Sequence, residues 1–308
     1  MQQQQVGRNI SSNISSNISS NISLPSSPET LATSSVLGLC FALGVPGNIL
    51  VLVLLSRWLK TGGSFTPRLL MSLGVSDLMT LLLLPVWIYS LLHDWVFGLA
   101  LCKILSYVVY WSLLSSVLCV TILSVQRYVQ VLHPQKWANL RARGHGIVGG
   151  IWILSGLLSC YSLVQRRVTT GKDGRLHCRA YFQNYSERVT TLVWETSVLF
   201  ALPFPVLVYF YVRLHRGVSQ SAFITTHRMT RLVIRIVLTF FFFWVPHHIN
   251  NITLIVAVLI GHEQLLKFAE AGSNVTGALT FINSCVNPFV YAFSARALRQ
   301  PRPGTDSA

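Results

Sequence analysis

The sequence predicts an all-α membrane protein: a bundle of seven transmembrane helices followed by a short amphipathic eighth helix. Three observations lead to this prediction. Of the 308 residues, 52% are hydrophobic and only 11% are charged, too few for the water-facing surface of a soluble protein of this length. The apolar residues fall into separate runs of about 20 residues or more, the length that crosses a bilayer. The basic residues collect between alternate runs, as in cytoplasmic loops.

The runs define the expected helices in order. Six of them are almost uninterrupted, whereas the seventh carries polar residues such as Glu270 and Asn283 and needs support from the charge pattern. The expected helices cover 34–56, 69–93, 100–125, 146–164, 189–212, 232–260 and 268–294.

The charge pattern supplies that support. The first loop contains Arg57, Lys60 and Arg68, while the N-terminal tail carries a single Arg and a single Glu. The tail is therefore expected outside, and the C-terminal segment with its three Arg inside. An odd number of crossings connects the two sides, so seven helices fit and six do not. The net charge of +15 is then largely explained by the basic residues of the cytoplasmic segments. Nucleic-acid binding is the other reading of a basic chain, but the sequence has no soluble basic domain to support it.

We accordingly expect three parts: a glycosylated extracellular tail 1–33, the bundle 34–294, and a cytoplasmic helix and tail 295–308. The chain would be a multi-pass protein of the plasma membrane. Repeated N-I-S triplets form glycosylation acceptors, although a low-complexity Asn/Ser expansion spells the same triplets. The acceptors are Asn9, Asn13, Asn17 and Asn21.

Two of the six cysteines lie on the expected outer side. Cys102 begins the third helix, and Cys178 lies in the longest outer loop. Because that compartment is oxidising, we predict a Cys102–Cys178 disulfide across the mouth of the bundle. The other four cysteines lie inside apolar runs and are expected to be small buried hydrophobes.

Each expected helix carries polar or proline residues in a recurring order. They are Gly47-Asn48, Leu73–Asp77, Gln126–Tyr128, Trp152, Leu202–Phe204, Tyr211, Phe243–Pro246 and Asn287–Tyr291. In order and in spacing, this set resembles the rhodopsin-like G-protein-coupled receptors over essentially the whole chain after residue 34. The resemblance implies a heterotrimeric G protein as the cytoplasmic partner.

Asp77 is a lone carboxylate near the middle of the bilayer, so it must be neutral, paired or bound to an ion. Helical stacking allows Ser116, Asn283 and Asn287 to converge on it. The resemblance implies that these four residues hold a sodium ion that favours the inactive state. A protonated Asp77 in a polar packing network is the alternative.

The resemblance also implies a switch in which Arg127 engages the G protein. The residues expected to act with it are Tyr211, Pro246 and Tyr291. The sequence departs from the family because Gln126 replaces the usual acid, and no Glu stands at the start of the sixth helix, 224–231. Two ionic restraints are missing, so raised basal activity is our hypothesis. The alternative is that a hydroxyl takes over as the partner of Arg127.

The stretch FFFWVPHHINN breaks an aromatic run with polar residues. Trp244, His248 and Asn251 recur at helical spacing on one face, and Trp244 resembles the tryptophan at the pocket floor of the family. We therefore expect a pocket wall. Headgroup polarity is one alternative. Zinc binding by the two histidines is another, but adjacent helical residues point about 100° apart and no third ligand is near.

The charge at the outer side predicts the chemistry of the ligand. Arginines dominate the outer loop and Glu195 lies inside the fifth helix, which suits an anionic amphiphile. Val109 stands where the family's amine receptors have Asp, and no Lys lies deep in the seventh helix for retinal. The segments Trp194–Phe204, Phe243–Asn251 and Gly277–Tyr291 look most like the leukotriene B4 receptors.

That resemblance assigns roles to individual residues. Arg166 and Arg188 would hold or steer the carboxylate, while ordinary solvated loop charge is the alternative for both. Glu195 and Asn251 would bind ligand hydroxyls, and His248 would line the pocket. The set is completed by Ser106, which replaces a family histidine, and by Tyr110 and Trp244.

The predicted function is a receptor for leukotriene B4 that signals through an inhibitory-class G protein, as chemoattractant receptors do in chemotaxis. It would catalyse no reaction, and its only cofactor would be the sodium ion. Another anionic lipid or a short acidic peptide is the alternative ligand. A transporter is the alternative class, although the sequence shows no internal repeat. An intramembrane enzyme would need a metal or nucleophile constellation, and we find none in the sequence.

Overall fold

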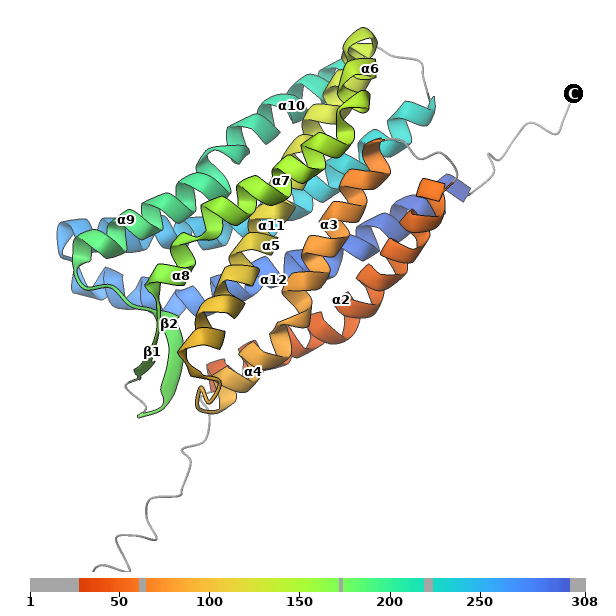
Figure 1. The fold of residues 1–308 in the computed structure, drawn as a ribbon. Coiled ribbons are helices and arrows are strands. Elements are labelled where there is room, and N and C mark those ends of the chain that lie inside the picture. Colours follow the sequence, from red (N-terminus) through yellow and green to blue (C-terminus); the bar gives the residue numbers. More distant parts are fainter. Residues whose placement is uncertain (1–27, 61–64, 172–173, 219–223, 300–308) are drawn as a thin grey trace, which may run out of the picture.

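A computed structural model describes residues 28–60, 65–171, 174–218 and 224–299. Within these residues the chain is a bundle of long helices with one small hairpin at one end (Figure 1). The predicted acceptors Asn9, Asn13, Asn17 and Asn21 lie outside the described residues.

The first four crossings account for the N-terminal half of the bundle. They are α2 (Pro28–Lys60), α3 and α4 (Phe65–Leu82 and Leu84–Leu92), α5 (Gly98–Leu132), and α7 and α8 (Gly144–Ser159 and Tyr161–Gln165). The short helix α6 (Pro134–Ala142) connects α5 to α7. The break between α3 and α4 falls just before Pro85, which has no N–H to continue the hydrogen-bond ladder.

A two-stranded hairpin separates the fourth crossing from the fifth. Strands β1 (Arg166–Thr170) and β2 (Leu176–Ala180) pair antiparallel, and the turn contains Gly174, which has a φ of 75°. A side chain is strained at such an angle, so glycine suits this turn. The hairpin was not predicted from the sequence.

The last three crossings run through proline residues. They are α9 (Tyr185–Thr196), the π-helical turn η2 (Ser197–Ala201) and α10 (Pro203–Val218) for the fifth, α11 (Ile224–Ile260) for the sixth, and α12 (Glu263–Arg299) for the seventh. In η2 the Leu202 N–H donates to the Ser197 carbonyl at 2.9 Å. This wider turn lies just before Pro203, which cannot donate.

Seven crossings agree with the predicted fold class. Six helical stretches of the described residues are long and apolar enough to span a bilayer. The seventh, α12, has 37 residues, which is about 55 Å of helix. The expected eighth helix differs: residues 295–299 continue α12 directly, because no Gly or Pro between Tyr291 and Arg299 ends it.

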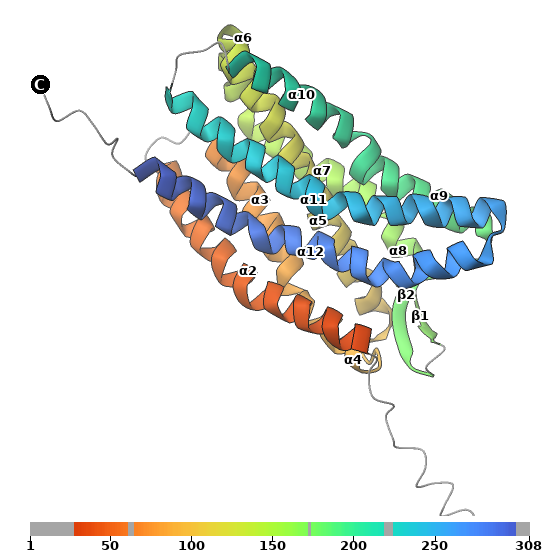
Figure 2. The same ribbon diagram turned by 180° about the vertical axis from the view of Figure 1, so that it is seen from behind.

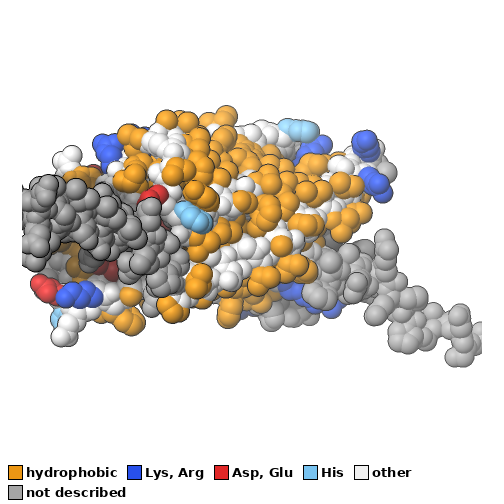
Figure 3. Space-filling view, turned by 90° about the horizontal axis from the view of Figure 1, so that it is seen from below, with side chains coloured by type: hydrophobic (Ala, Val, Ile, Leu, Met, Phe, Trp, Pro, Cys, Tyr) orange, Lys and Arg blue, Asp and Glu red, His pale blue; other side chains and the backbone are white. Residues whose placement is uncertain are grey.

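Close packing of the crossings brings their polar residues together. Helix α2 lies beside α12 (Figure 2). Added Cβ atoms on Gly44 and Gly47 would come within 2.7 Å of Leu81 and 3.0 Å of Pro288. The Asn48 amide donates to the Ser284 carbonyl at 3.1 Å. The face of the bundle seen in Figure 3 carries a broad apolar band with Lys and Arg toward its ends, as expected of a membrane protein.

Candidate functional site

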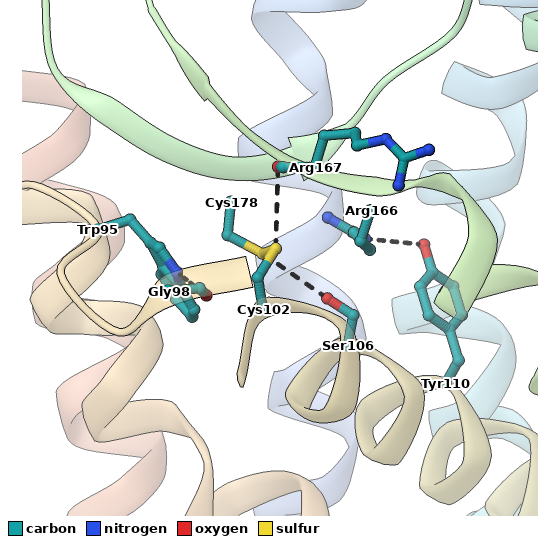
Figure 4. The surroundings of a disulfide bond; sticks show 8 residues. All are labelled: Trp95, Gly98, Cys102, Ser106, Tyr110, Arg166, Arg167 and Cys178. Carbon is teal, nitrogen blue, oxygen red and sulfur yellow. Dashed lines mark hydrogen bonds between the residues drawn. A yellow bond between two sulfur atoms is a disulfide. The ribbon is translucent and has the colours of Figure 1, made fainter. Parts of the chain in front are cut away.

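The predicted disulfide Cys102–Cys178 is confirmed. It joins the first turns of α5 to strand β2 at the hairpin end of the bundle (Figure 4). Trp95 forms one buried cluster with the two cysteines, and its backbone N–H donates to the Leu176 carbonyl at 2.9 Å. The hairpin is thus fixed over the mouth of the bundle, where a ligand would enter.

Arg166 lies where α8 passes into β1 and points to Tyr110 on α5 (Figure 4). Its guanidinium donates to the Tyr110 hydroxyl at 3.3 Å, and its Cζ lies 5.7 Å from the centre of the ring. Both contacts are with a neutral group. Within the described ranges no carboxylate pairs with Arg166, so its charge is available to an anion.

Arg188 is placed differently. It lies in the first turn of α9, and its Nη1 is 2.9 Å from Oε1 of Glu270 on α12. From the sequence, Glu270 is only a polar interruption of the seventh apolar run. No sequence signal pairs these residues, because their contact depends on how two distant helices meet at the mouth.

A polar cluster lies where α9 faces α11. His247 Nε2 is 3.3 Å from Glu195 Oε1 and 3.4 Å from Asn251 Nδ2. The side chains of Glu195 and His247 are 12% and 18% exposed. The predicted residues Glu195 and Asn251 are therefore brought together by His247, a residue to which no ligand-binding role was assigned from the sequence.

His248, predicted to line the pocket, lies between aromatic rings on the inward face of α11. It is fully buried and stacks between Phe200, 4.7 Å away, and Trp244, 5.7 Å away. Both of its ring nitrogens have no hydrogen-bond partner among the described residues. The spacing of residues 244, 248 and 251 correctly indicates an inward face. It does not indicate that two aromatic rings enclose the second histidine.

Ser106 lies directly beneath the disulfide (Figure 4). It is 1% exposed, and its hydroxyl is 3.9 Å from Cys178 Sγ. Nearby, Tyr110, Tyr161 and Glu195 are among the residues that line a cavity of about 10 Å³, room for roughly one water molecule. A larger ligand would have to displace side chains here.

The second cluster surrounds Asp77, which is completely buried. Its carboxylate accepts from the Asn287 amide at 2.7 Å and from the Ser116 hydroxyl at 3.4 Å. Asn283 is also buried, and the side-chain oxygens of Asn283 and Asn287 have no partner among the described residues. A carboxylate with unpartnered amide oxygens is a donor set that suits a hard cation, so these residues fit a sodium ion.

The third cluster lies near the end of α5 that is farther from the hairpin. Arg127 donates to the Thr66 hydroxyl and to the Gln130 side chain, both at 2.8 Å. Gln126 donates to the same hydroxyl at 2.5 Å. The hydroxyl partner that was left open as the alternative to a missing ionic latch is therefore Thr66, in the first turn of α3.

The remaining switch residues are only partly described. Pro246 lies inside the continuous helix α11, and the Tyr291 hydroxyl is buried without a partner among the described residues. The side chain of Tyr211 lies outside the described part of the chain.

Comparison with known proteins agrees with this arrangement. Residues 47–291 match the family described as 7 transmembrane receptor (rhodopsin family). Human leukotriene B4 receptor 1 is 34% identical over 271 residues, which is 85% of this chain and 76% of that protein. G-protein coupled receptor E1 of equine herpesvirus 2 (strain 86/87) is 32% identical over 85% of this chain and 70% of that protein. Human C-C chemokine receptor type 1 is 32% identical over 85% and 76%.

Proposed function

Because this chain belongs to the seven-transmembrane receptors of the rhodopsin family, we propose that it binds an anionic lipid, leukotriene B4 in particular, and signals through an inhibitory-class G protein. Members of this family are G-protein-coupled receptors embedded in the membrane, not enzymes. The ligand, the G-protein class, the plasma-membrane location and the extracellular, glycosylated tail are parts of the proposal.

The observation that carries the ligand assignment is the separation of charge in the outer half of the bundle. Arg166 lies near the mouth on a neutral tyrosine. Glu195, His247 and Asn251 form an enclosed polar cluster between α9 and α11. Leukotriene B4 has a carboxylate at one end and hydroxyl groups along its chain. The arginine suits the first, and a cluster of mixed donors and acceptors suits the second.

The proposal is tested by a leukotriene B4 dose–response in cells that express the full chain, with inhibition of cAMP as the readout. We expect a saturable response that Arg166→Ala shifts to higher concentration by about tenfold or more, because a charge-assisted contact contributes roughly 1.5–3 kcal/mol. Arg167→Ala is the matched control, since Arg167 is adjacent, equally charged and exposed. A receptor that reaches the surface and stays silent would rule out leukotriene B4.

A short acidic peptide is the second candidate. Arg167 and Arg179 are direct neighbours across the hairpin, and both are exposed. Like charges opposite one another in a strand pair are unfavourable, so an acidic partner would stabilise this outer face of the hairpin. In that case Arg167→Ala, rather than Arg166→Ala, would weaken the response.

A further inference from the structure

The ion pair between Arg188 and Glu270 has a consequence for ligand selection. We propose that Glu270 is a specificity-determining residue: it holds Arg188 in the ligand-free receptor and competes with the anionic group of the ligand for that cation. This inference rests on the proposed function, because it concerns the same pocket mouth and the same class of anionic lipid.

The position of Arg188 explains why it needs an anion. It lies in the first turn of α9, where the helix dipole disfavours a positive charge. The adjacent carboxylate of Glu187 accepts the Gln183 backbone N–H at 2.7 Å and so caps the helix start. Glu270, from α12, supplies the anion for Arg188 at 2.9 Å. A ligand carboxylate would meet the same requirement.

The exposure of the pair makes such an exchange feasible. The side chains of Arg188 and Glu270 are 22% and 45% exposed. Ion pairs with this access to water are weak, with a median contribution that corresponds to less than about fivefold in an equilibrium constant. Glu270 therefore restrains Arg188 without locking it, and an incoming anion can replace Glu270 at modest cost.

The two arginines of the mouth thus differ in their availability. Arg166 has only the neutral Tyr110 as a partner among the described residues, whereas Arg188 already has a carboxylate. An anionic ligand can therefore pair with Arg166 at no cost to another ion pair. To pair with Arg188 it must first displace Glu270, which lowers the binding free energy gained there. The wild-type receptor thus discriminates less between charged and neutral head groups than two unpaired arginines would.

The test compares Glu270→Gln, Arg188→Gln and the double variant, with displacement binding of leukotriene B4 and of its methyl ester as the measurement. We expect Glu270→Gln to lower the Kd for the acid by about three- to fivefold and to leave the ester unchanged. Arg188→Gln should weaken acid binding more when Glu270→Gln is also present. Glu263→Gln is the matched control: it removes a charge from the same helix, where Glu263 faces Lys267 at 3.9 Å in an exposed i,i+4 pair.

Two outcomes would overturn the inference. One is an unchanged Kd for the acid in Glu270→Gln, and the other is an equal gain for acid and ester, which would point to shape rather than charge. A ligand-free measurement separates this failure from that of the proposed function. If leukotriene B4 binds neither wild type nor Glu270→Gln, that ligand is wrong. The melting temperatures of the purified single and double variants then decide on the ion pair: additive effects overturn it, and coupled effects support it.

Discussion

At the scale of single residues, the Thr66 hydroxyl serves as a partner of Arg127, a role that the resemblance to the family assigns to acidic side chains. Arg127 is almost completely buried, and an unpaired buried cation is costly. With Gln126 beside it and no Glu at the start of α11, the Thr66 hydroxyl is a partner that links Arg127 to α3. A hydrogen bond to a charged group contributes about 1.5–3 kcal/mol, so one hydroxyl is enough to bias a two-state receptor.

We therefore expect Thr66→Val to raise signalling without ligand. Loss of the hydroxyl removes two hydrogen bonds at once, from Arg127 and from Gln126, and frees Arg127 for a partner in the cytoplasm. Basal inhibition of cAMP, normalised to surface expression, should increase about fivefold or more. Thr121→Val is the control, because among the described residues the Thr121 hydroxyl bonds only to the Val117 carbonyl, one turn earlier in its own helix. Equal or lower basal signalling in Thr66→Val would count against this role.

The Asp77 cluster gives a second prediction at the same scale. If sodium binds there and favours the inactive state, replacing sodium by a bulky organic cation should raise agonist affinity in wild type. The coupling between two sites is typically fivefold or more. Asp77→Asn removes the charge but retains the side-chain volume, so it should abolish the dependence on sodium. Radioligand binding at constant ionic strength measures this, and a sodium effect that survives in Asp77→Asn would place the ion elsewhere.

At the scale of helices, two irregular elements decide what faces the pocket. The π turn η2 inserts a wider turn between α9 and α10, and it places Phe200 against His248. The close contact of α2 with α3 and α12 depends on a small residue at position 44. Both features set the position of a helix relative to its neighbours, which the periodicity of apolar residues does not encode.

Gly44→Val should disrupt the second of these features. A Cβ at this position would lie 2.7 Å from the Leu81 side chain and 3.1 Å from the Cys285 backbone, and the backbone atom cannot give way. Overpacking of this kind costs about 1–3 kcal/mol, which should lower the thermal stability of the purified receptor by several degrees and reduce its surface expression. Gly38→Val is the control on the same helix, because a Cβ there would meet no other described residue within 4 Å beyond its own stretch of helix. Equal stability of the two variants would contradict the close-packing argument.

At the scale of the whole molecule, the sequence predicts the long-range plan better than the local contacts. Hydropathy and charge predict the crossings and their orientation because the bilayer imposes one length and one charge rule on every helix. The disulfide was predictable because only two of the six cysteines fall on the expected outer side. His247 and Glu270 were not recognised, because spacing along one helix indicates a face and says nothing about which side chain of another helix meets it. The continuation of α12 past residue 294 escaped prediction for a similar reason: composition marks amphipathic residues but not where a helix bends.

The length of α11 has a mechanical consequence. The helix runs unbroken from Ile224 to Ile260 with Pro246 inside it, so about 33 Å of helix extends from the proline back to Ile224. Proline is a common site of helix bending. If this segment pivots there by about 10°, its far end sweeps sideways by roughly 6 Å. The helix then acts as a lever arm, which amplifies a small change of angle at Pro246 into a much larger displacement at its far end.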